Sequence, residues 1–181
     1  MSRLGRRHGV AGLALLLVGL LGFWWVENYS PLRREPLVGG VVAGEHWQVR
    51  AWRDLDRKSV CAGLFIRYTD SDGHRQWSRS GTEACAWAKT SDGSGWVRDG
   101  GAEQVRSSGE WVFYGVVPEE GATVRLTLPG KGTQQVATFS RRGFAGRFYV
   151  IHQPRFSPSG NDLNHARLVL LDASGKALNV Y

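Results

Sequence analysis

Residues 10–26 of this chain are all apolar, and no later segment is comparably hydrophobic. An α-helix rises about 1.5 Å per residue, so a segment of this length spans roughly 26 Å, close to the thickness of a bilayer core. Trp24 and Trp25 lie at its end, and Arg6 and Arg7 precede it. Tryptophan favours the headgroup layer and basic residues favour the cytoplasmic side. The sequence therefore predicts one N-terminal transmembrane helix with a cytoplasmic N-terminus.

A cleavable signal peptide is the alternative interpretation of this segment. Signal peptides also begin with basic and apolar residues, but small residues usually precede their cleavage site. Here the segment ends in Phe23, Trp24 and Trp25, and no cysteine follows closely to accept a lipid. We therefore expect an uncleaved anchor. The predicted division of the chain is a cytoplasmic flank (1–9), a transmembrane anchor (10–26), a linker (27–44) and an extracytoplasmic domain (45–181).

The two cysteines, Cys61 and Cys85, give independent support for export. An even number of cysteines in an exported domain indicates a disulfide, whereas cytosolic thiols stay reduced. The sequence therefore predicts a disulfide between Cys61 and Cys85, in a domain on the outer side of the plasma membrane.

Basic residues exceed acidic ones, and the resulting net charge of +7 is spread along the chain. Such a spread is typical of a solvated surface, although on a membrane-tethered domain it can also attract anionic lipid or acidic wall polymers. The linear sequence has no basic stripe interleaved with aromatic residues, and export removes nucleic acid from reach. We therefore expect no nucleic-acid partner.

From Glu45 onward, short alternating apolar segments are separated by turn residues, which is typical of β-sandwiches and β-barrels. About nine strands are predicted, at 46–53, 60–69, 74–78, 110–117, 123–128, 133–139, 147–152, 167–171 and 176–180. Both faces of 110–117 are apolar, as in a strand that is buried on both sides. The predicted fold class is all-β, an immunoglobulin-like sandwich or a small barrel. The two cysteines are closer in sequence than the usual inter-sheet pair of an immunoglobulin domain.

Four segments in the C-terminal part carry a resemblance: Tyr114-Gly115-Val116-Val117-Pro118, the predicted strand 123–128 after it, Gly146-Arg147-Phe148-Tyr149-Val150 and Leu171-Asp172-Ala173-Ser174-Gly175-Lys176. Together they resemble the tails of uncharacterised exported or membrane-anchored β-sandwich proteins of high-GC Gram-positive bacteria. The resemblance begins at about Tyr114 and implies a location in the cell envelope. It implies no activity.

Thr82-Glu83-Ala84-Cys85 resembles part of the Thr-Leu-x-Thr-Cys strand of sortase transpeptidases. These are membrane-anchored β-barrel enzymes with an active cysteine, histidine and arginine. The resemblance implies Cys85 as nucleophile, with His46 or His74 upstream and Arg98 downstream. The Leu and the second Thr of the pattern are absent, and a disulfide at Cys85 would remove the nucleophile. A sortase-like thiol transpeptidase is therefore the alternative to a binding protein.

The histidines are isolated in the sequence and lack the spacing of metal ligands, so we expect no metal site and no cofactor. Asp70-Ser71-Asp72-Gly73 has the composition of a hairpin turn. An EF-hand loop is excluded there, because Tyr68 and Arg79 stand where acidic ligands are needed.

Trp87 and Trp96 flank a polar stretch rich in Gly, Ser and Asp, where exposed indole rings can stack on sugars or on a protein partner. Core packing is the alternative role for these tryptophans. A second candidate contact is the loop with Asn161, Asp162 and His165, for which a polar turn is the alternative. The sequence thus predicts a membrane-anchored binding module of the cell envelope and no enzyme. Its expected partner, besides the membrane that holds 10–26, is another membrane protein or wall polysaccharide.

Overall fold

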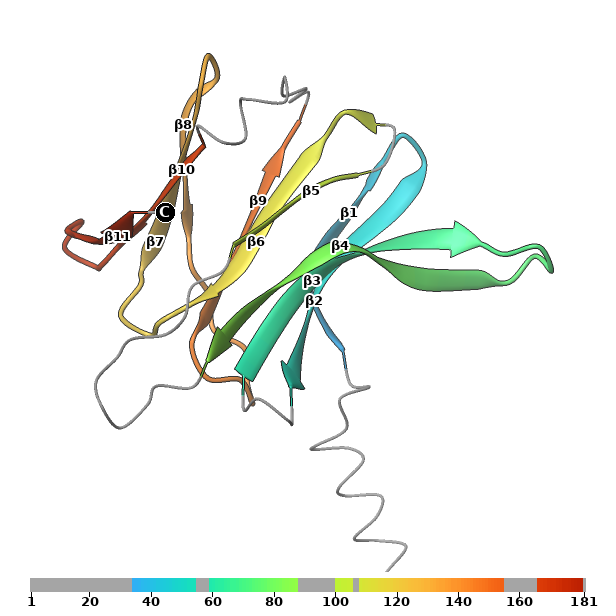
Figure 1. The fold of residues 1–181 in the computed structure, drawn as a ribbon, viewed down its shortest axis with the longest axis horizontal. Coiled ribbons are helices and arrows are strands. Elements are labelled where there is room, and N and C mark those ends of the chain that lie inside the picture. The colour runs from blue at the N-terminus through green and yellow to red at the C-terminus, as the bar shows by residue number, and fades with distance from the viewer. Residues whose placement is uncertain (1–33, 55–58, 88–99, 106–107, 155–165, 181) are drawn as a thin grey trace, which may run out of the picture. The chain divides into compact units, whose positions relative to one another are not determined.

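The computed structural model describes residues 34–54, 59–87, 100–105, 108–154 and 166–180, and the compact domain begins at Arg34. These residues form eleven β-strands and no α-helix, arranged in three antiparallel sheets (Figure 1). The all-β prediction is confirmed. No helix among the described residues is long and apolar enough to cross a bilayer, and the predicted anchor, 10–26, lies outside them.

The three sheets are named A, B and C. Sheet A has the strand order β1-β2-β3-β4, formed by β1 (Glu35–Val42), β2 (Glu45–Asp54), β3 (Ser59–Thr69) and β4 (Arg75–Trp87). Sheet B has the order β5-β6-β9, formed by β5 (Gly100–Gln104), β6 (Trp111–Val117) and β9 (Arg147–Gln153). Sheet C has the order β11-β10-β7-β8, formed by β7 (Thr123–Leu128), β8 (Gly132–Ala137), β10 (Arg167–Leu171) and β11 (Ala177–Val180).

Sheet B lies between the other two sheets (Figure 1), and β6 is buried on both faces. Val112, Tyr114 and Val116 pack in the core shared with sheet A. Phe113 and Val117 pack in the core shared with sheet C. A strand covered on both sides cannot leave a charged side chain unpaired, and β6 carries no charge. The prediction of two-sided burial for 110–117 is confirmed.

Sheets A and C each pack apolar side chains against one face of sheet B, so that two cores form. The core between sheets A and B includes the alternating β2 residues Trp47, Val49 and Ala51 and the alternating β3 residues Ala62, Leu64 and Ile66. The core between sheets B and C includes Val124, Leu126 and Leu128 from β7, Ile151 from β9 and Leu170 from β10. The period-2 alternation in the sequence therefore gives the correct inner face of β2, β3 and β7.

Two strands of the structure were not among the nine predicted, namely β1 and β5. The predicted linker is wrong over 35–42, because these residues form β1 and pair with β2. Pro36 is tolerated in β1 because this strand is at the edge of the sheet. Gly40 lies against Trp47, where an added Cβ would be 3.1 Å from the indole nitrogen. Gly40 therefore allows the close packing of this edge strand on Trp47, and the edge position accommodates Pro36.

The predicted hairpin turn at 70–73 is confirmed, and 172–176 forms the same kind of turn. Asp70 Oδ1 accepts the backbone N–H groups of Asp72 and His74, at 3.1 and 2.8 Å. Asp172 Oδ1 accepts those of Ser174 and Lys176, both at 2.9 Å. Asp70 therefore stabilises the turn between β3 and β4, and Asp172 stabilises the turn between β10 and β11.

Because β6 supports both cores, truncating one of its large side chains is expected to destabilise the whole domain. Phe113, which is 1% exposed, is the test position. Phe113→Ala is expected to lower the free energy of unfolding by about 3–5 kcal/mol. Gln134→Ala, on the exposed edge strand β8, is the control and should change it by no more than about 0.5 kcal/mol. Urea denaturation measures both, and equal effects would contradict the two-sided core.

Candidate binding surface

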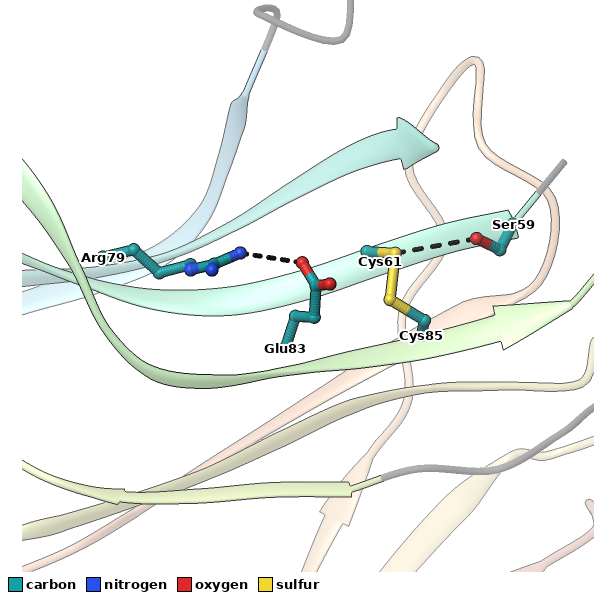
Figure 2. The surroundings of a disulfide bond; sticks show 5 residues. All are labelled: Ser59, Cys61, Arg79, Glu83 and Cys85. Atoms are coloured by element: carbon teal, nitrogen blue, oxygen red, sulfur yellow. Dashed lines mark hydrogen bonds and ion pairs between the residues drawn. A yellow bond between two sulfur atoms is a disulfide. The ribbon is translucent and has the colours of Figure 1, made fainter. Parts of the chain in front are cut away.

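The predicted disulfide between Cys61 and Cys85 is confirmed. The two residues lie directly opposite each other on β3 and β4, so the bridge ties neighbouring strands of sheet A (Figure 2). Ser59 Oγ lies 3.7 Å from Cys61 Sγ. Neither cysteine is free, and Cys85 therefore carries no thiol that can act as a nucleophile.

The disulfide lies on the face of sheet A that points away from the core. Residues opposite each other in an antiparallel pair share a face, so the register identifies the other members of this outer face. They include Gln48, Arg50, Trp52 and Asp54 on β2, Ser59, Cys61, Gly63, Phe65, Arg67 and Thr69 on β3, and Arg75, Trp77, Arg79, Glu83, Cys85 and, by its backbone register, Trp87 on β4.

Two aromatic residues form the centre of the outer face. Trp52 and Phe65 are only 7% and 0% exposed, and their rings meet edge to face at 6.1 Å. Gly63 makes this packing possible, because an added Cβ there would be 2.9 Å from Trp52 Cη2. Trp52 and Phe65 form a small cluster with Cys61, against which Trp77 and Cys85 are packed. The disulfide therefore joins β3 and β4, two of the three strands that carry this aromatic cluster.

Two arginines stack on the aromatic cluster. The Arg34 guanidinium lies 5.0 Å from the centroid of Phe65 and 5.7 Å from that of Trp52. The Arg50 guanidinium lies 5.3 Å from the centroid of Phe65 and 4.6 Å from that of Trp77. Each such cation–π contact contributes about 0.5–1 kcal/mol when exposed and about 2 when desolvated. The two guanidinium groups and the aromatic rings therefore form one continuous stack.

Gln48 fixes the position of Arg50. Its side-chain oxygen accepts hydrogen bonds from Arg50 Nε at 3.1 Å and from an Arg50 terminal nitrogen at 2.9 Å. Burial, and next the positive charge of Arg34, lower the pKa of Arg50. The group stays charged at neutral pH, because the ordinary arginine pKa is far above 7. Arg50 is thus a positioned, partly desolvated cation.

The outer face is basic overall. Its arginines are Arg34, Arg50, Arg67, Arg75 and Arg79, against the acidic residues Asp54 and Glu83. Arg79 forms an ion pair with Glu83 at 2.8 Å (Figure 2). Within the described ranges, neither Arg34 nor Arg50 makes an ion pair with a carboxylate. The described part of the chain therefore offers the stacked guanidinium groups no carboxylate, and an anionic partner can bind them.

The edge strand β4 is attached to sheet B at an irregularity of its pairing with β3. The register shifts between Gly63 and Leu64, where β4 holds extra residues at 81 and 82. The Thr82 N–H donates to the Glu103 carboxylate at 2.9 Å, and the Tyr114 hydroxyl donates to the Thr82 carbonyl at 2.8 Å. These bonds hold β4 in place and so fix the position of the outer face.

Two other polar clusters lie away from this face. Glu110 and His152 pair through Oε2 and Nε2, and the His152 ring lies 5.3 Å from that of Trp47. Asp70, Asp72 and His74 lie close enough together to share a cation. The Asp70 carboxylate, however, already accepts backbone hydrogen bonds within the turn and one from Gln76 Nε2 at 2.6 Å. The geometry of this cluster is that of a turn.

Of the sequence-predicted contact residues, Trp87 is the one whose backbone the structure describes, and its register position is on the outer face. Trp87 is the last residue of β4 and its backbone pairs with Ser59, but its side chain lies outside the description. Trp96, Asn161, Asp162 and His165 lie outside the described residues, as does Arg98.

Sequence reasoning missed Arg50, Trp52, Phe65 and Trp77 as members of one surface. The signal that could have found them is alternation combined with strand pairing, since aromatic and arginine residues occupy, on three neighbouring strands, the positions that point away from the core between sheets A and B. The statement that arginines and aromatics are not interleaved holds for the linear sequence and is wrong for the folded domain.

Comparisons with protein-family models, with curated proteins and with solved structures find no match for this chain. The class that the fold defines is a disulfide-containing, all-β, sandwich-like domain. The assignment of its function therefore rests on the outer face itself.

Removing the disulfide is expected to destabilise the domain strongly. The bridge joins residues 24 apart in sequence, and closing such a loop is worth about 3 kcal/mol in the chain-entropy model. The double variant Cys61→Ala/Cys85→Ala should lose about that amount in urea denaturation. Wild-type protein in reductant is the control and should lose a similar amount. A loss below about 1 kcal/mol would contradict this role.

The alkaline titration of Tyr114 tests its attachment to β4. Burial, and next the charge of Glu103, raise the pKa of Tyr114 from 10.0 to about 12. Because the folded pKa is above the unfolded one, this contribution to stability is complete below pH 10 and is lost as pH rises towards 12. The phenolate absorbance of wild type minus that of Tyr114→Phe should titrate near 12. A titration near 10 would show that the hydroxyl is not buried.

Proposed function

We propose that this chain is a membrane-anchored binding module of the cell envelope, with residues 10–26 as its single transmembrane anchor and the domain outside the plasma membrane. The outer face of sheet A is its binding surface. The observation that carries the proposal is the stack of Arg34 and Arg50 on Phe65, beside a disulfide, with no ion pair to a carboxylate among the residues that the structure describes.

Several features support the extracytoplasmic location. Disulfides persist in oxidising compartments and are rare in the cytosol. The apolar length of 10–26 and the basic residues before it fit a single-pass anchor with a cytoplasmic N-terminus. The resemblance of the C-terminal segments to exported proteins of high-GC Gram-positive bacteria agrees with this location. We also propose that sheets A and B together form an immunoglobulin-like sandwich.

Binding is favoured over catalysis by the chemistry of the outer face. Arginine and aromatic side chains held on paired strands make a rigid recognition surface. The alternative, a sortase-like thiol transpeptidase, requires a thiolate at Cys85, and the disulfide occupies that sulfur. Candidate partners are another membrane protein, wall polysaccharide or the membrane surface. Trp87, Trp96 and the loop with Asn161, Asp162 and His165 remain proposed secondary contacts.

Thiol mapping on native membranes tests the location and the alternative together. The full chain is alkylated before and after reduction, in right-side-out vesicles, and its peptides are identified by mass spectrometry. The expected result is a Cys61–Cys85 bridge together with an intact peptide from residues 1–9. Two free thiols would instead place the domain in a reducing compartment or restore Cys85 as a nucleophile. Either explanation would overturn the proposal.

A further inference from the structure

We propose that the outer face of sheet A docks on the anionic phospholipid surface of the membrane that holds residues 10–26, with its arginines bound to lipid phosphates and Trp77 at the level of the headgroups. This inference deepens the proposed function and rests on it. Docking through this face gives the domain a defined orientation on the bilayer.

The length of chain between the anchor and the domain supports this partner. Residues 27–33 separate Val26 from Arg34, and Arg34 is itself part of the stack on Phe65. An extended chain covers at most about 3.4 Å per residue, so Arg34 lies within about 27 Å of the end of the anchor. The outer face therefore begins within reach of the headgroups of the membrane that the anchor crosses.

The charges of the face are complementary to a phosphate-rich surface. Arg67 is half-buried and Arg75 is exposed on the same face as Arg50, and Arg34 and Arg50 form no ion pair within the described part of the chain. A guanidinium can bind two oxygens of one phosphate, which makes arginine better suited than lysine to such a surface. An anionic surface would also relieve the repulsion between Arg34 and Arg50, which are stacked on the same ring.

The aromatic side chains favour a lipid interface over a sugar. A sugar-binding site needs an open ring face on which the sugar can stack, but Trp52 and Phe65 are 7% and 0% exposed and have guanidinium groups beside them. Trp77 is half-buried, with Arg50 over its ring. Tryptophan and arginine side chains with an apolar body and a polar end are typical of the headgroup layer.

Arginine labelling of the reconstituted full chain tests the docking. The chain is placed in nanodiscs of phosphatidylcholine alone or of phosphatidylcholine with phosphatidylglycerol, treated with phenylglyoxal and analysed by mass spectrometry. Labelling of Arg67 and Arg75 should fall by at least about threefold with phosphatidylglycerol at about 50 mM salt, and should recover at about 500 mM. Arg125 and Arg167, on sheet C, are internal controls whose labelling should not change.

Matched charge reversals separate docking from a general charge effect. Arg67→Glu/Arg75→Glu changes the outer face, and Arg125→Glu/Arg167→Glu makes the same change of charge on sheet C. Hydroxyl-radical oxidation of Trp77 is the readout, after circular dichroism has confirmed that both variants fold. Phosphatidylglycerol should protect Trp77 in wild type and in the sheet C variant, and should not protect it in the outer-face variant.

Three results would overturn the inference. The first is equal labelling of Arg67 and Arg75 in nanodiscs with and without phosphatidylglycerol. The second is an equal loss of Trp77 protection in the outer-face variant and in the sheet C variant. The third is protection by soluble acidic wall polymer without protection by phosphatidylglycerol, which would assign the face to the wall. A failure of the chain to insert into either nanodisc would overturn the anchor itself. Thiol mapping and insertion therefore report on the proposed function, and phosphatidylglycerol-dependent labelling reports on the docking.

Discussion

The burial of β6 on both faces is the constraint on which the arrangement of the sheets depends. Val112, Tyr114 and Val116 require a sheet on one side, and Phe113 and Val117 require a sheet on the other. Sheet B satisfies both requirements by lying between sheets A and C (Figure 1). One face of sheet A then belongs to the core, and the other carries the smaller cluster of Trp52, Cys61 and Phe65 together with arginines that a core excludes.

The outer face of sheet A is held in place by contacts at one edge strand. The disulfide joins β4 to β3, and Glu103 and Tyr114 join β4 to sheet B. Each constraint lowers the freedom of β4, and so Trp77 and Arg50 keep a fixed relative position. A rigid surface of stacked guanidinium groups and rings loses little entropy when it binds, which suits a domain tethered close to its partner.

Local sequence patterns were sufficient to predict the positions of many of the strands. The strands 123–128 and 167–171 begin and end where alternation and turn residues predicted, and Asp70 and Gly73 identified the hairpin after β3. The pairing of Cys61 with Cys85 followed from the fact that the chain has two cysteines. The strand β1 was missed, because Pro36 and Gly40 are unfavourable in an isolated strand and become acceptable only at the edge of a sheet beside β2.

The sequence by itself determined the all-β class, the two-sided burial of β6 and the disulfide, because alternation, turn chemistry and cysteine number are properties of short segments. Only the tertiary structure decided that Arg34, Arg50, Phe65 and Trp77 form one stack. These residues come from separate segments of the chain, and their contact depends on the register between strands. Register is set by pairing and core packing over the whole sheet, which no local pattern specifies.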